Sequence, residues 1–293
     1  MRCVPNILIG ELMKAVSRGT IPGRRPGHKK DANHPAAAGQ AFAGRYHKES
    51  RAALPPLRGR LEDRSAYPLS AETLYDRGAV VAALSGVRLE PYLAAVAGDY
   101  ERSLALYVWN ARMAAALFEE IHYAEVFLRN ALAGQLEAID AANPAASGRW
   151  YDQGFLDEAA STEIAKAREK LIRRRAPLTE GRIIAELPLG FWQGLIVNRD
   201  QRLWERGLYR AFANFPASAG QEHEVVGTAI HKLCDLRNRI AHHEPIFRRD
   251  QAADHCLITE LVSWISADAA AWIEEVGRVL EVSSHRPADL DPG

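Results

Sequence analysis

The longest helical signal of the chain covers residues 100–142, which read YERSLALYVWNARMAAALFEEIHYAEVFLRNALAGQLEAIDAA. This stretch contains no proline, and Gly134 is its only glycine. Apolar side chains recur in it three or four residues apart, the spacing of a buried helical stripe. They are Leu117, Ile121, Ala124, Leu128, Leu132, Leu136 and Ile139. Asn143-Pro144 ends the pattern, because proline disfavours helical geometry in the residue before it. The stretch therefore predicts one long helix, or two helices joined by a bend.

Helical periodicity continues through most of the chain outside this stretch. Apolar spacing, caps and proline stops predict further helices. They cover residues 70–84, with Ser70 as the N-cap, and residues 90–97, 157–175, 199–215, 222–241, 249–265 and 268–280. Residues 187–192 are expected to form a turn that leads into a short apolar segment. Convincing alternating strand patterns are absent from the sequence, so the predicted fold class is all-α.

The first 60 residues differ from the rest in charge and composition. They hold 12 Lys and Arg against 3 Asp and Glu, together with 6 Pro and 7 Gly. Such a stretch is expected to be a disordered basic leader, which could attract nucleic acid or could bind nothing in particular. The predicted organisation is a leader over 1–60, a helical domain over 61–283 and a tail over 284–293.

Bulk features favour a soluble protein of the cytoplasm. No apolar run approaches the roughly 18 residues that span a bilayer. The apolar patch of residues 4–9 is soon interrupted by Glu11 and Lys14, which argues against a secretory signal. The cysteines are few and show no CxxC spacing, a usage typical of a reducing compartment. We therefore expect no membrane association.

Candidate chemistry concentrates near the end of the predicted helix 222–241. On a helical wheel Arg237 flanks the stripe formed by Leu233 and Ile240, so its guanidinium must be paired or must face a site that needs positive charge. Pro245 predicts that the helix ends close to His243. An arginine, an amide, two imidazoles and a carboxylate are thus expected to cluster at one helix end.

An arginine followed five residues later by a histidine suits RNA cleavage without a metal. Histidine can take a proton from the 2′-hydroxyl or give one to the leaving oxygen, and arginine can hold the phosphate bidentately. In an unbroken helix, however, Arg237 and His242 point about 140° apart. Either the helix unwinds before His242, or a two-fold dimer brings two such pairs together. We favour the dimer.

The wording around this pair is more specific than its spacing, which occurs by chance in many chains. Residues 236–247, LRNRIAHHEPIF, closely resemble the signature of the Abi-like (abortive infection) proteins of the HEPN superfamily. Residues 107–110 (YVWN) and 125–132 (EVFLRNAL) resemble the family's first long helix, and Phe191-Trp192 resembles its aromatic mid-chain segment. The resemblance covers about residues 61–280 and leaves the basic leader outside.

The resemblance implies a HEPN-type helical bundle with additional helices, usually a homodimer, that acts on RNA without a metal or cofactor. It implies that Arg237 binds the phosphate and His242 is catalytic. Asn238 matches the polar residue after the arginine, and His243 and Glu244 match positions beside the site. Glu244 stands where a related branch carries a tyrosine that its antitoxin adenylylates, which argues against that route of silencing.

Several residues outside this motif can be interpreted either as functional or as structural. Glu125, Arg129 and Asn130 either line a cleft shared with Arg237, or the first two form an ordinary helical ion pair. Three aromatic side chains, Trp109, Phe191 and Trp192, could stack on bases, but such residues more often belong to the core. The run 173–175, RRR, either contacts RNA or is a solvated helix end.

Two functions follow from these readings. The first is an endoribonuclease that acts in phage defence or as a toxin, restrained by an antitoxin or a regulatory RNA. The second is a non-catalytic HEPN module that binds RNA or a protein partner. The intact Arg237/His242 pair favours the first function, because a binding module does not need an acid–base group.

Overall fold

The computed structural model describes residues 76–143, 149–152, 156–197, 201–216 and 222–287. Helices account for all the regular secondary structure of these residues, and no strand occurs among them. The predicted all-α class is therefore confirmed. None of the helices within these ranges is both long enough and apolar enough to cross a bilayer. The leader 1–60 and the expected N-cap Ser70 lie outside the described residues.

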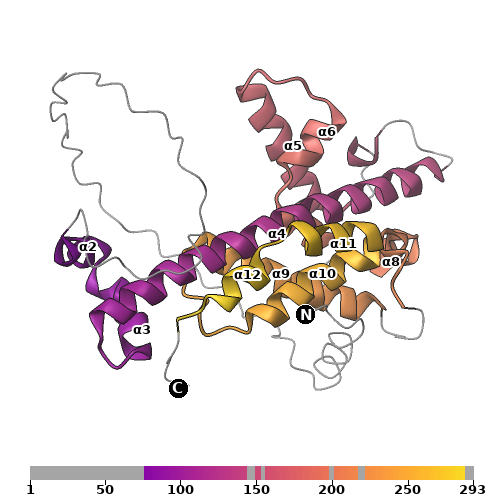
Figure 1. The fold of residues 1–293 in the computed structure, drawn as a ribbon. Helices are drawn as coiled ribbons and strands as arrows, with labels where there is room; N and C mark the ends of the chain where they lie inside the picture. The colour runs from indigo at the N-terminus through magenta and orange to yellow at the C-terminus, as the bar shows by residue number, and fades with distance from the viewer. Residues whose placement is uncertain (1–75, 144–148, 153–155, 198–200, 217–221, 288–293) are drawn as a thin grey trace, which may run out of the picture.

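Helix α4, Tyr100–Ala141, is the axis of the fold. Its 42 residues correspond to about 63 Å, and it crosses the whole molecule without a break (Figure 1). The predicted apolar stripe is buried from Leu117 to Leu136, whereas Ile139 is only half-buried near the helix end. One long helix, rather than two with a bend, is thus what the sequence encodes.

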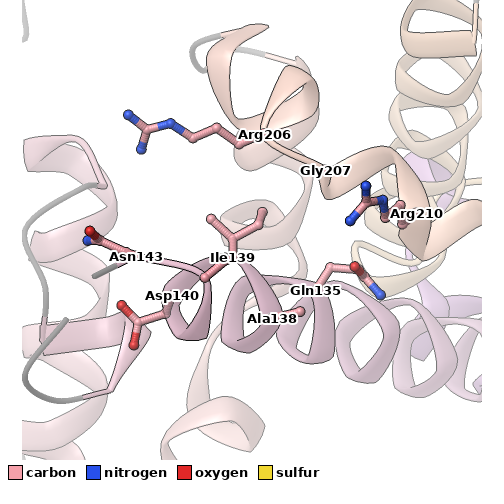
Figure 2. Close-up of a pocket in the computed structure, with 9 residues that line it drawn as sticks. Gln135, Ala138, Ile139, Asp140, Asn143, Arg206, Gly207 and Arg210 are labelled. Atoms are coloured by element: carbon pink, nitrogen blue, oxygen red, sulfur yellow. The ribbon is translucent and has the colours of Figure 1, made fainter. Parts of the chain in front are cut away.

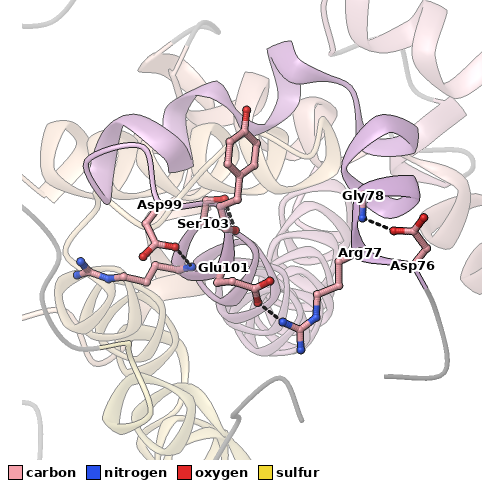
Figure 3. Close-up of polar contacts among 8 residues, drawn as sticks. Asp76, Arg77, Gly78, Asp99, Glu101 and Ser103 are labelled. Carbon is pink, nitrogen blue, oxygen red and sulfur yellow. Dashed lines mark hydrogen bonds and ion pairs between the residues drawn. The ribbon is translucent and has the colours of Figure 1, made fainter. Parts of the chain in front are cut away.

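Two short helices precede α4 and cover its N-terminal end: α2, Arg77–Leu84, and α3, Gly86–Ala95. Aspartates cap the helices of this region. Asp76 accepts hydrogen bonds from the amides of Gly78 and Ala79, and the bond from Gly78 is drawn in Figure 3. Asp99 likewise accepts from Arg102 at the start of α4. Arg77 reaches across to form an ion pair with Glu101 of α4 (Figure 3). These contacts fix α2 against the first turn of the long helix.

The C-terminal helices run along one side of α4, and the first two of the middle helices lie on the opposite side (Figure 1). The middle elements are α5, Glu158–Arg173, α6, Glu180–Glu186, α7, Leu189–Val197, and α8, Gln201–Glu205, with 3₁₀ turns η1, Trp150–Asp152, and η2, Leu208–Phe212. The C-terminal elements are α9, Glu222–Ala241, α10, Gln251–Ile265, α11, Ala267–Val276, and α12, Val279–Ser284. Helix α4 packs directly against α3, α7, α9, α10 and α12, so it supplies one wall of the core throughout.

Two predicted helices are divided in the structure. Residues 199–215 contain α8 and η2, which are separated at Gly207, where φ is 123°. That backbone conformation is open to glycine and ends α8. Residues 268–280 are divided at Gly277, which follows α11, and the chain then continues as α12. In both places a glycine inside an apolar pattern marks a break, so the predictions of single helices there were wrong.

The aromatic residues with two readings belong to the core. Phe191 and Trp192 are buried and pack edge to face with ring centroids 4.9 Å apart. Trp109 is also buried, and its indole N–H donates to the Val282 carbonyl at 2.8 Å. A base could not reach these rings without opening the core. Their structural reading is therefore confirmed.

Candidate functional site

Helix α9 ends in a hydrogen-bonded turn that determines where the candidate residues lie. The amide of His243 donates to the Ile240 carbonyl at 3.0 Å, and the amide of Glu244 donates to the Arg239 carbonyl at 2.9 Å. These two bonds form a Schellman motif, which requires a left-handed residue at its centre. His243 occupies that position with φ of 57°, where glycine is the usual residue. The predicted helix end at His243 is confirmed.

Arg237 is paired with a carboxylate from the long helix. Its Nε lies 3.3 Å from Oε1 of Glu125 on α4. Within the described residues, Nε is the only guanidinium nitrogen of Arg237 that makes a hydrogen bond. The side chain is 39% exposed, so Nη1 and Nη2 remain free to bind a ligand. This arrangement holds the guanidinium from one side and leaves a two-pronged donor for an anion such as phosphate.

His242 is placed differently. Its side chain is exposed and makes no hydrogen bond or ion pair with the residues that the structure describes. Its amide still donates to the Asn238 carbonyl at 2.9 Å, so the helical pattern continues through His242. The helix therefore does not unwind before this residue. Within one chain Arg237 and His242 keep the angular separation of about 140° that a regular helix imposes.

The three supporting residues lie around this helix end. Asn238 is exposed one turn before His242 on the same face. Glu244 forms an ion pair with Arg239 at 3.1 Å. The carbonyl of His243 accepts from Nη1 of Arg88 on α3 at 2.6 Å. The backbone of this turn is thus tied to α3, while the imidazole of His242 is left open to solvent.

Of the possible cleft residues on α4, Glu125 forms an ion pair with Arg237. The alternative of an ion pair between Glu125 and Arg129 is not what the structure contains. Arg129 lies one turn further along, and its buried Nε has no hydrogen-bond partner among the described residues. Asn130 is exposed.

Close to the Glu125–Arg237 pair, burial raises the pKa of the Cys234 thiol to about 12, and the carboxylates of Glu125 and Asp235 add to the shift. Cys234 is therefore a neutral thiol near pH 7.

A groove of about 530 Å³ lies between α3, α4 and the end of α9. Its α4 wall includes Asn110 and Phe118, and its α9 wall includes Ala241, His243 and Glu244. Arg237 and His242 themselves do not line it. We call this space the α3–α4–α9 groove. Sequence reasoning did not assign it, although Asn110 belongs to the YVWN stretch that was singled out for another reason.

The floor of the α3–α4–α9 groove is aromatic. Tyr92 is buried, and its ring packs against Tyr107 and Phe247 with centroids 5.2 Å and 5.0 Å away. Burial raises the pKa of Tyr92 to about 12, with Tyr107 adding to the shift and Arg88 opposing it. The phenol therefore stays protonated near neutral pH. No signal in the sequence pointed to Arg88, which meets this site only through the fold.

A second cavity of about 410 Å³ lies at the other end of α4 (Figure 2). Gln135 and Ile139 of α4 line one side of it, and Arg206 and Arg210 line the other. The two guanidinium groups are exposed and do not converge on one point in this view (Figure 2). This cavity contains none of the residues expected to carry chemistry.

Two further histidines are held by carboxylates. His255 of α10 and Glu120 of α4 form a buried pair, with Nδ1 2.8 Å from Oε2. On α9, His231 lies between Gln193 at 3.0 Å and Asp235 at 3.4 Å. Across the described parts of the chain, no group of three or more His, Cys, Asp or Glu residues is placed to hold a metal ion.

Comparisons with known proteins found no match. No family model, curated protein or solved structure matches this chain.

Proposed function

We propose that this protein is a metal-independent endoribonuclease of the HEPN type, which acts as a homodimer in phage defence or as a toxin. The observation that supports the proposal most strongly is how the guanidinium of Arg237 is paired. Glu125 holds its guanidinium through Nε, and the two Nη atoms are left for a phosphate. The resemblance of residues 236–247 to the Abi-like signature supports the same assignment.

The proposed reaction is a transesterification within the RNA strand. One imidazole takes the proton of a 2′-hydroxyl, and the 2′-oxygen attacks the adjacent phosphorus. The bond from phosphorus to the 5′-oxygen breaks, and a second imidazole gives that oxygen a proton. The products are a 2′,3′-cyclic phosphate and a 5′-hydroxyl. Arg237 stabilises the additional negative charge on the phosphate oxygens in the transition state.

A dimer would meet two requirements of this reaction at once. In one chain Arg237 and His242 diverge along a regular helix, so a single copy does not aim both at one phosphate. Two copies related by a two-fold axis would supply two imidazoles and two guanidiniums to a shared cleft. His242 is exposed and Arg237 is half-exposed, which leaves both accessible to such a partner.

The same divergence favours a second candidate function. A chain that remains monomeric would have a phosphate-binding arginine without an acid–base group beside it. Such a protein would bind RNA or a protein partner without cutting RNA. The two candidates are separated by whether the protein dimerises and whether it cleaves.

The test is cleavage of labelled single-stranded RNA by the purified full-length protein in the presence of EDTA. We expect cleavage with a cyclic phosphate terminus, and we expect His242→Ala to abolish it with an unchanged circular dichroism spectrum. His223→Ala is the control, since His223 lies at the start of α9, at the other end of that helix from His242. Equal cleavage by the wild type and His242→Ala would remove His242 from the mechanism. Binding without cleavage would establish the second candidate.

A further inference from the structure

The α3–α4–α9 groove and the Glu125–Arg237 pair lie along one seam between antiparallel segments of α4 and α9. On α9, Arg237 and Ala241 are four residues apart and share a face, so the groove begins one turn beyond the arginine. On α4, Phe118 and Glu125 are seven residues apart and also share a face. That spacing corresponds to about 10 Å along the helix. A ligand bound at Arg237 therefore has the groove one to two helical turns away along the same seam.

The polar group inside the groove has a fixed orientation. Asn110 is 6% exposed, and its Oδ1 accepts from the amide of Ile246 at 2.8 Å. Because this bond identifies the oxygen, the remaining amide nitrogen is a donor. Nδ2 makes no hydrogen bond to any residue in the described ranges. Asn110 thus offers its N–H groups to an acceptor inside the groove, such as a ring nitrogen or carbonyl of a nucleobase.

The remaining walls suit a flat ring with a phosphate beside it. Phe118 is 41% exposed and lines the groove, so part of its ring is accessible for stacking. Arg88 lies at the wall formed by α3 and uses only Nη1 to bind the His243 carbonyl. Glu244 is the acidic group of the lining, and Arg239 neutralises it. The volume of about 530 Å³ lies within the usual range for small-molecule pockets.

We infer that the α3–α4–α9 groove binds the base of a nucleotide next to the phosphate held by Arg237, in single-stranded RNA. Phe118 stacks on the base, and Asn110 donates to an acceptor on its edge. The inference rests on the proposed function for its choice of RNA as the ligand. It adds a base-reading subsite whose residues come from α3 and α4, outside the motif of residues 236–247.

The test separates base binding from cleavage. Full-length protein with His242→Ala is titrated with fluorescent 2′-O-methyl oligonucleotides of each of the four bases, which lack the attacking hydroxyl. We expect one base to bind more tightly than the others, and we expect Phe118→Ala to weaken that binding about ten-fold. The control is Tyr209→Ala, which removes an aromatic side chain of similar exposure at the other end of α4.

A second variant addresses the edge of the base. Asn110→Asp keeps an oxygen for the Ile246 amide and replaces the donor by an acceptor, so the preferred base should change. Loss of binding in Arg237→Ala with no change in Phe118→Ala or Asn110→Asp would overturn the subsite. An effect of Phe118→Ala on sedimentation but not on RNA binding would also overturn it, because the groove would then be a protein contact. Failure of the proposed function has a different signature, which is intact base binding in a wild type that does not cleave.

Discussion

Helices α5 and α9 end in the same backbone motif, yet the side chains at their C-caps differ in whether they are paired. Arg175 and His243 hold equivalent left-handed positions with φ of 53° and 57°, and each is followed two residues later by a proline. The residues just before them, Arg174 and His242, are therefore equivalent caps. Arg174 binds Glu186 at 2.6 Å, whereas His242 has no partner among the described residues. The same turn can therefore present a paired or an unpaired side chain, depending on whether a carboxylate lies next to it.

The same contrast extends to the basic run 173–175. Glu186 of α6 pairs with both Arg174 and Lys170, so one carboxylate offsets part of the positive charge at the end of α5. Within the run, this pairing favours the structural interpretation for Arg174, and Arg173 and Arg175 are exposed. At the end of α9, Glu125 and Glu244 each hold one arginine and leave the imidazole of His242 untouched.

The largest expected difference between the two helix ends concerns catalysis. Arg237→Lys removes the two-pronged donor while keeping the charge, and we expect it to lower kcat for RNA cleavage about 100-fold. Arg174→Lys, at the end of α5, should leave kcat unchanged. Single-turnover cleavage assays measure both. Equal losses in the two variants would mean that the end of α9 has no special role.

A smaller effect should be common to both ends. Glycine removes the cost of a left-handed backbone, so Arg175→Gly and His243→Gly should each raise the free energy of unfolding by about 1 kcal/mol. Arg173→Gly, inside the last turn of α5, should instead lower it by about 1 kcal/mol. Urea denaturation gives all three values. A gain at 175 without one at 243 would show that the His243 side chain makes a compensating contact.

The smallest expected effect is confined to α5 and depends on pH. The hydrogen bond from Lys170 lowers the pKa of Glu186, and the charges of Lys170 and Arg174 lower it further. A lowered carboxyl pKa contributes stability above the unfolded-state pKa of about 4.3, and this contribution is lost as pH falls through the folded-state value. Wild type should therefore be more stable than Glu186→Gln at pH 6, and the difference should vanish near pH 3. Chemical denaturation at both pH values measures it, and a constant difference would contradict the assignment.

Local pattern was sufficient to predict most helices of this fold. The stripe of α4, the proline after Asn143 and the proline after Glu244 all act within a few residues, and the structure follows them. The predicted helices 199–215 and 268–280 ran across Gly207 and Gly277, because the sequence does not state the backbone angle that a glycine adopts. The position of Arg237 beside the apolar stripe predicted a partner or a ligand, and Glu125 was noted separately.

The parts that could not be predicted depend on contacts between distant residues. Glu125 and Arg237 are 112 positions apart, and Asn110 and Ile246 are 136 positions apart. Helical periodicity shows that each side chain flanks a buried stripe but does not show which stripe it meets. The groove has the same origin, since its walls come from α3, α4 and α9. Only the packing of these helices brings Arg88 to the carbonyl of His243.

Helix α4 has a consequence for how such a site could be switched. Helix α4 is uninterrupted and carries four of the side chains discussed above, Asn110, Phe118, Glu125 and Arg129. Its single glycine, Gly134, lies beyond all four. The spacing among these four side chains is therefore fixed by the geometry of a continuous helix. A regulator that opens or closes the space around them has to shift α3 or the end of α9, because α4 is unbroken over these positions.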